Sequence, residues 1–169
     1  MQINVSQLLR EPIGATRDYE IDGVADVGGD AGDYAVKGAC HLLRTQRSIL
    51  VKCGLAMETG LVCSRCLGRF RHPLKIKFEE EYFPTVDVVS GVPLPQPEEA
   101  STFTIDEHHI LDLTEAVRQY VLMSIPMKPL CDADCAGLCP QCGKNFNQGS
   151  CDCPSPDIDP RWSELTKLL

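Results

Sequence analysis

Six cysteines within residues 131–153, in the stretch CDADCAGLCPQCGKNFNQGSCDC, constrain the fold of this chain more than any other feature. Their spacing is C-x3-C-x3-C-x2-C-x8-C-x-C. A segment so short and so poor in apolar residues cannot build its own hydrophobic core, so a bound metal or covalent cross-links must compensate. The cysteines therefore predict a metal site, a disulfide framework or a redox centre.

The start of the chain bears on this choice. MQINVSQLLREPIGATRDYE has neither the basic start nor the long apolar core of a secretory signal, and no apolar run approaches the roughly 18 residues of a membrane span. We therefore expect a cytoplasmic protein with no membrane partner. In the reducing cytosol, clustered cysteines serve as metal ligands or catalytic thiols rather than as structural disulfides.

The pair in CPQCG is the most informative part of the cluster. Two cysteines separated by two residues can both reach one tetrahedral zinc ion, and the following glycine lets backbone amides turn towards the thiolates. The intervening NFNQGS is rich in turn residues, which suits a return of the chain to the same ion. The simplest prediction is a zinc site with the ligands Cys139, Cys142, Cys151 and Cys153.

Other cysteines leave alternatives open. Cys131 and Cys135 compete for the same metal, where they can replace the last two cysteines of the tail. They can instead combine with Cys63 and Cys66, the pair in VCSRCL, to form a second site. An iron–sulfur centre uses the same ligand type and is not excluded by spacing.

A thiol redox enzyme is a further alternative, because the chain has two Cys-x-x-Cys pairs. Thioredoxin-like chemistry needs the pair at the start of a helix, and Pro73 argues against a helix after VCSRCL. No histidine, glycine loop or carboxylate pair has a catalytic context. We therefore expect a protein that is not an enzyme. Cys40 and Cys53 lie in apolar strand patterns and are predicted to be small buried residues.

Alternating apolar residues predict strands from Tyr34 to Phe83, preceded by an extended piece near residue 17. Leu74, Ile76 and Phe78 point one way while the lysines between them point the other. The pattern predicts an α+β protein whose antiparallel β-sheet, over about residues 17–83, is open or curled towards a barrel.

The second half of the chain divides into three parts. The acidic, proline-rich residues 84–111 form a long connection with a short strand at 102–105. Residues 112–125 form a helix with a capping-box start at Asp112 and Glu115, whose apolar face covers the sheet. We expect a sheet domain of residues 1–125 and a zinc-binding tail of residues 126–169, which ends in a short helix.

Charge is distributed unevenly despite a net charge of −8. Nine basic residues and one acid lie between Lys37 and Lys77, whereas residues 78–112 hold nine acids and no lysine or arginine. The stretch CSRCLGRFRHPLKIK has no acid, so its cations can bind phosphates while its aromatic ring stacks on a base. The acidic connection could equally pair with or cover these cations. The candidate nucleic-acid-binding residues are Arg65, Arg69, Phe70, Arg71, Lys75 and Lys77.

Four stretches in this order resemble the YceD-like family of large ribosomal RNA subunit accumulation proteins. They are LVCSRCLGRF, PLKIKFEEEYFP, DLTEAVRQYVLMSIPMKPLC and DCAGLCPQCGKNFNQGSCDC, and the resemblance extends from about Val36 to the end. Arg65 and the asparagines of the tail also suit turn formation and thiolate solvation around a metal. The family-like positions are Cys63, Arg65, Cys66, Gly137, Leu138, Cys139, Cys142, Gly143, Asn145, Asn147, Cys151 and Cys153.

The resemblance implies a non-catalytic cytoplasmic factor in ribosome biogenesis that supports accumulation of large-subunit (23S) ribosomal RNA. We expect its partner to be ribosomal RNA or a pre-ribosomal particle, bound through the basic strand-turn-strand, with assembly proteins as further partners. A protein-interaction adaptor that does not touch RNA is the first alternative.

Overall fold

The computed structural model describes residues 1–26, 33–95 and 102–154. Seven strands, two α-helices and one 3-10 helix occur in these ranges. In chain order they are β1 (Gln2–Asn4), α1 (Ser6–Arg10), β2 (Thr16–Asp26), β3 (Asp33–Arg44), β4 (Ile49–Val62), β5 (Arg69–Pro84), β6 (Phe103–Ile105), β7 (Ile110–Asp112), α2 (Thr114–Ser124) and η1 (Phe146–Gln148).

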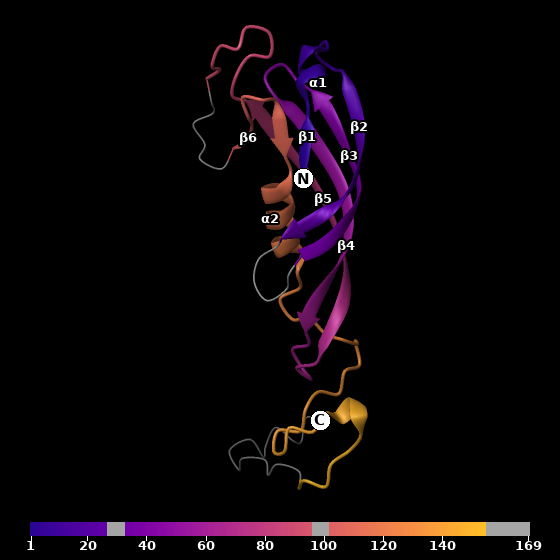
Figure 1. Cartoon of the computed structure of the whole chain (residues 1–169). Coiled ribbons are helices and arrows are strands. Elements are labelled where there is room, and N and C mark those ends of the chain that lie inside the picture. Colours follow the sequence, from indigo (N-terminus) through magenta and orange to yellow (C-terminus); the bar gives the residue numbers. More distant parts are fainter. Residues whose placement is uncertain (27–32, 96–101, 155–169) are drawn as a thin grey trace, which may run out of the picture.

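The seven strands form one curved sheet in the order β1-β7-β6-β5-β4-β3-β2. Strands β2 to β5 are a long antiparallel meander, while β6 runs parallel to the end of β5. The sheet curls round α2 as a half-barrel (Figure 1). The predicted α+β class with a barrel-like sheet and a covering helix is therefore confirmed, and the parallel β5–β6 pair is an addition to it.

The core lies between the concave face of the sheet and α2. Alternation places Val51, Leu55 and Ile76 on this face, and all three are buried. Helix α2 contributes the apolar stripe predicted from its sequence, including Val117 and Val121. The ring of Tyr120 stacks on Phe78 with 4.9 Å between ring centroids. Burial of this shared apolar surface stabilises the sheet and the helix together.

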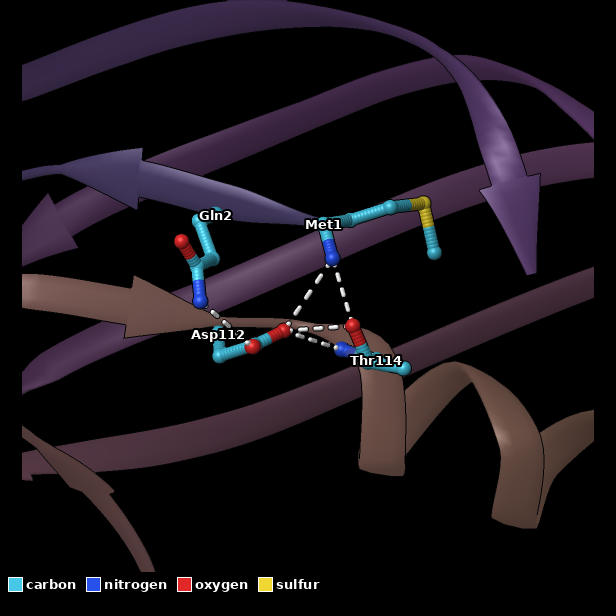
Figure 2. Close-up of polar contacts among 4 residues, drawn as sticks. All are labelled: Met1, Gln2, Asp112 and Thr114. Carbon is cyan, nitrogen blue, oxygen red and sulfur yellow. Dashed lines mark hydrogen bonds and ion pairs between the residues drawn. The ribbon is translucent and has the colours of Figure 1, made fainter. Parts of the chain in front are cut away.

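Strands β1 and β7, which were not predicted from the sequence, extend the sheet beyond β6, and β7 leads directly into α2. Figure 2 shows the amine of Met1 donating to Asp112 Oδ1 at 3.1 Å and to Thr114 Oγ1 at 2.5 Å. Asp112 also accepts the backbone N–H of Thr114 at 2.9 Å. The predicted capping box is wrong in one respect, because the carboxylate of Glu115 binds Arg118 and Gln119 rather than the start of the helix.

Cys40 and Cys53 are buried, as predicted, but they are joined by a disulfide that the sequence analysis did not anticipate. The register explains the contact, because these residues lie directly opposite each other on β3 and β4. Directly paired side chains share one face of an antiparallel sheet and meet there.

The β4–β5 hairpin extends beyond β3 as a two-stranded arm, because β3 pairs with β4 only as far as Met57. Its tip reaches the cysteine-rich tail, coloured orange to yellow in Figure 1. The division at residue 126 stays a prediction, and the predicted terminal helix lies outside the described residues. Within the described ranges no helix has the length and apolar character that crossing a bilayer requires.

Candidate metal centres and nucleic-acid interface

Four cysteines meet where the hairpin tip touches the tail. We call Cys63, Cys66, Cys131 and Cys135 the hairpin–tail cluster, and their sulfurs all lie within 4.8 Å of one another. The sulfurs of Cys63 and Cys135 are 3.7 Å apart, and those of Cys66 and Cys131 are 3.6 Å apart. Two of these ligands come from the β4–β5 turn and two from the start of the tail.

The other four cysteines of the tail meet independently. Cys139, Cys142, Cys151 and Cys153, which we call the tail cluster, also have sulfurs within 4.8 Å of one another. This is the simplest ligand set that the sequence predicted. Of the two assignments left open for Cys131 and Cys135, the structure shows the pairing with Cys63 and Cys66.

Both clusters are built on the same turn. The N–H of Leu67 donates to the carbonyl of Cys63, and the N–H of Cys63 donates to the carbonyl of Gly68, at 3.0 and 2.9 Å. In the tail cluster, Gly143 donates to Cys139 and Cys139 donates to Lys144, both at 2.9 Å. The equivalent residues Leu67 and Gly143 both have positive φ, at 55° and 73°. Such a turn holds two sulfurs on one side of the backbone.

Backbone amides stabilise one thiolate in each cluster. The backbone N–H groups of Cys66 and Cys131 lower the pKa of the Cys63 thiol to about 6. Those of Cys142 and Gln141 lower the pKa of Cys139 to about 6. Another thiol in each set is held protonated, because contact with Cys66 raises the pKa of Cys131 to about 12 and contact with Cys142 does the same for Cys153. Four thiolates can coexist at this distance only around a cation.

Arg65 links the hairpin to the tail through hydrogen bonds. Its guanidinium donates to the carbonyl of Cys135 at 2.9 Å and to that of Ala133 at 3.4 Å. The neighbouring N–H of Ser64 donates to the carbonyl of Pro129 at 2.8 Å. Arg65 was predicted as a nucleic-acid contact, and the structure shows its guanidinium hydrogen-bonded to carbonyl oxygens of the tail.

Asn147, from η1, supports the hairpin–tail cluster from the other side. Its amide nitrogen donates to Cys135 Sγ at 3.2 Å, and its carbonyl oxygen accepts the N–H of Ala136. Gly137 has a φ of 79°, in the left-handed region that favours glycine, and lies against the backbone of Arg65. Two of the family-like positions are thereby explained, Asn147 by its hydrogen bond to a cysteine sulfur and Gly137 by its backbone conformation.

Each cluster can hold one metal ion. Tetrahedral coordination at about 2.3 Å from a zinc ion places sulfurs roughly 3.8 Å apart, close to the 3.6 and 3.7 Å separations in the hairpin–tail cluster. All four sulfurs of each set lie within 4.8 Å of one another, whereas the cysteine sulfurs around a polynuclear iron–sulfur centre lie further apart. Neither Cys-x-x-Cys pair begins a helix among the described residues, so neither has the helix N-terminus typical of thioredoxin-like thiols.

Four of the cations predicted to bind nucleic acid lie on one side of β5. Arg69, Arg71, Lys75 and Lys77 alternate along the convex side of the strand and are exposed; we call them the basic face. Arg71 lies 3.5 Å from the carboxylate of Glu58. Within the part of the chain that the structure describes, the other three form no ion pair.

Phe70 does not lie on the basic face. It points to the opposite side of β5, where it is half-buried and packs against the hairpin–tail cluster. The ring therefore cannot stack on a base held by Arg69 and Arg71, because period-2 alternation puts neighbouring residues on opposite sides. The described parts of the acidic connection lie at the far end of β5, where β6 pairs with Tyr82–Pro84, and do not cover the basic face.

Comparison with known proteins adds an independent observation. The family model described as "Large ribosomal RNA subunit accumulation protein YceD" matches residues 51–169. These residues hold most of β4, all of β5, α2 and every cysteine of both clusters. No solved structure matches the chain significantly.

Curated relatives come from bacteria and a plant. An uncharacterized protein of Mycobacterium tuberculosis is 28% identical over 128 residues, which cover 72% of this chain and 56% of the relative. The uncharacterized protein YlbN of Bacillus subtilis is 31% identical over 66% of this chain and 61% of its own length. The "Large ribosomal RNA subunit accumulation protein YCED homolog 1, chloroplastic" of Arabidopsis thaliana is 33% identical over 34% of this chain and 18% of its own length. The chain spans about half the length of the first of these relatives.

Proposed function

Because the chain belongs to the YceD family of large ribosomal RNA subunit accumulation proteins, we propose that it is a ribosome biogenesis factor that supports accumulation of large-subunit ribosomal RNA. It acts in the cytoplasm by binding this RNA, alone or in a pre-ribosomal particle, and it catalyses no reaction. The observation that carries the proposal is the basic face of β5.

The basic face suits an RNA backbone. Residues two apart on a strand are roughly 6.6 Å apart, similar to the spacing of consecutive phosphates along a strand of RNA. Directly across on β4, Lys77 faces Gly54, Lys75 faces Ala56 and Arg71 faces Gly60. These small residues leave the cations standing above a flat surface, so phosphates can approach them closely. Arginine can also bind a phosphate through two parallel hydrogen bonds.

The two cysteine clusters have a structural role in this proposal. Zinc bound to four thiolates is closed to substrate and stabilises the fold of a small segment. The hairpin–tail cluster lies at the tip from which the basic face begins, so its metal would hold the arm and the tail in one arrangement. Zinc is the metal we propose, because an all-thiolate set of four is its usual structural site, and elemental analysis of the purified protein would distinguish it from iron, which four thiolates also bind.

Reversal of two charges tests RNA binding directly. We expect Arg69→Glu/Arg71→Glu to lose most of its affinity for large-subunit ribosomal RNA fragments, measured by fluorescence anisotropy between 50 and 200 mM salt. The slope of log affinity against log salt should fall by roughly 1.4, since each neutralised phosphate of a single strand contributes about 0.7. Arg10→Glu/Arg47→Glu is the matched control, because both arginines are exposed and lie outside the arm.

Two outcomes would contradict RNA binding. One is a wild-type protein with no salt-dependent affinity for the RNA, and the other is equal loss in the control and the β5 variant. Co-purification of wild type with assembly proteins, unchanged by ribonuclease, would then favour the adaptor that does not touch RNA.

A further inference from the structure

Leu67, at the tip of the β4–β5 hairpin, has a backbone conformation that leucine rarely adopts. Its φ is 55°, in the left-handed region where a Cβ crowds the following carbonyl. The hydrogen bonds of the cysteine turn require this conformation at the residue after Cys66. Gly143 occupies the equivalent place in the tail cluster, where glycine meets the same requirement without strain.

Burial does not compensate for the strain at Leu67. Leu67 is 65% exposed, and Val62, at the end of β4 before the same turn, is 49% exposed. The other described residue with positive φ that is not glycine is His109, whose Nδ1 is buried. The turn accounts for the backbone conformation of Leu67, but neither the turn nor burial accounts for a leucine at this position rather than a glycine.

The surroundings indicate what Leu67 contacts. Val62 lies directly opposite Arg69, and Leu67 precedes Arg69 by two residues in the chain, so both exposed apolar residues adjoin the first residue of the basic face, one across the hairpin and one along the chain. Arg69 is exposed, and Lys75 and Lys77 follow on the same side of β5. An apolar tip beside a row of cations is complementary to a nucleic acid, whose phosphates meet the cations while a base meets the leucine. Nucleic-acid-binding proteins use leucine, isoleucine and methionine as wedges between bases in this way.

We propose that Leu67, supported by Val62, is an apolar wedge that packs against an unstacked base of the RNA held by the basic face. The inference rests on the proposed function and adds to it a contact with a base. Recognition would then favour loops, bulges or ends, where bases can be unstacked, over continuous duplex.

Leu67→Gly tests the contact with a base without destabilising the fold. Glycine removes the side chain and the backbone strain together, so we expect the thermal midpoint to stay equal or rise and the metal content to stay unchanged. Affinity for a looped ribosomal RNA fragment should fall roughly tenfold, the change that corresponds to losing burial of most of one leucine side chain. Affinity for a fully paired RNA of equal length should change little.

Two further variants and a control complete the test. Asparagine tolerates the left-handed conformation, so Leu67→Asn should fold and lose the same affinity, whereas Leu67→Met should retain it. Val89→Gly, which removes an 84% exposed valine outside the arm, should bind like wild type.

The results distinguish the wedge from RNA binding itself. Suppose that wild type binds RNA and that Arg69→Glu/Arg71→Glu weakens binding. If Leu67→Gly and Leu67→Asn then bind like wild type, the proposed contact of Leu67 with a base is wrong, while RNA binding by the basic face is supported. If Leu67→Gly weakens association with purified large-subunit particles but not with naked RNA, the leucine contacts protein and the wedge is again wrong. If wild type binds no RNA, the proposed function fails first.

Discussion

The two cysteine clusters share one ligand type and one turn but differ in where their ligands come from. The tail cluster takes all four from residues 139–153. The hairpin–tail cluster joins residues 65 and 72 positions apart in the chain. Its cysteines are mostly buried, with Cys131 exposed, whereas in the tail cluster only Cys139 is buried.

This difference separates two uses of a metal. A local site orders the segment that contains it, because its ligands are already close in the unfolded chain. A non-local site closes a long loop, so the metal opposes a larger loss of chain entropy and joins two parts of the fold. We therefore expect the tail cluster to shape the tail and the hairpin–tail cluster to fasten it to the arm.

Removal of both metals should have the largest effect. Structural zinc sites in small domains contribute roughly 10–16 kcal/mol of apparent binding free energy, so a strong chelator should unfold residues 131–153 while the hydrophobic core of the sheet persists. Hydrogen exchange would show lost protection at the amides of Cys139 and Gly143 and retained protection in β3. Simultaneous loss in β3 would contradict the separation between sheet and tail.

Single-ligand variants should distinguish the two clusters. Cys66→Ser and Cys142→Ser should each lower the metal content from two ions to one, as measured by native mass spectrometry. We expect only Cys66→Ser to release the tail from the arm and increase the radius of gyration in small-angle scattering. Equal expansion in both variants would mean that the clusters fold as one unit.

Loss of the Arg65 side chain should have an intermediate effect. Arg65→Ala removes the hydrogen bonds to Cys135 and Ala133, which are worth roughly 1.5–3 kcal/mol for a charged donor and fall near the low end at an exposed site. Metal transfer to a chromogenic chelator should become faster from the hairpin–tail cluster and stay unchanged from the tail cluster. Arg65→Lys keeps the charge but lacks the planar donor pair, so its rate of metal transfer should lie between those of wild type and Arg65→Ala.

Substitution of Asp112 should have the smallest effect of these changes, and it tests the stability of the sheet alone. Burial raises its pKa, but hydrogen bonds from Thr114, the terminal amine and Gln2 outweigh burial and hold it at about 2, below the ordinary 3.8. Its contribution is therefore complete above about pH 4 and lost as the pH falls towards 2, by about 1 kcal/mol after allowance for solvent screening. In Asp112→Asn, the free energy of unfolding, measured with urea, should depend less on pH between about 4 and 2.

Asp112 is also the test of whether acid acts on the sheet or on the cysteine sites. Protons displace metal from thiolates, so both clusters lose metal on acidification. A metal-free preparation of wild type that still shows the Asp112 slope, beside an Asp112→Asn variant that does not, would assign that slope to the sheet. Identical profiles would contradict the assignment.

Local patterns predicted much of this molecule correctly. Alternation identified the buried face of β5, and the 3.6-residue period identified the apolar stripe of α2. The short strands β1 and β7 were missed because three residues carry almost no pattern, and their pairing depends on residues more than a hundred positions apart. The disulfide between Cys40 and Cys53 was missed because strand register is a property of the assembled sheet.

The sequence by itself predicted the tail cluster as the simplest ligand set, because its four cysteines lie within fifteen residues with turns between them, but it left Cys131 and Cys135 as competing ligands. It also determined which β5 residues share a side, through the period of two. Only the tertiary structure decided that Cys63 and Cys66 meet Cys131 and Cys135, that Arg65 binds the tail, and that the turn leaves Leu67 exposed. These depend on how a hairpin and a distant segment approach each other, and spacing along the chain does not encode that approach.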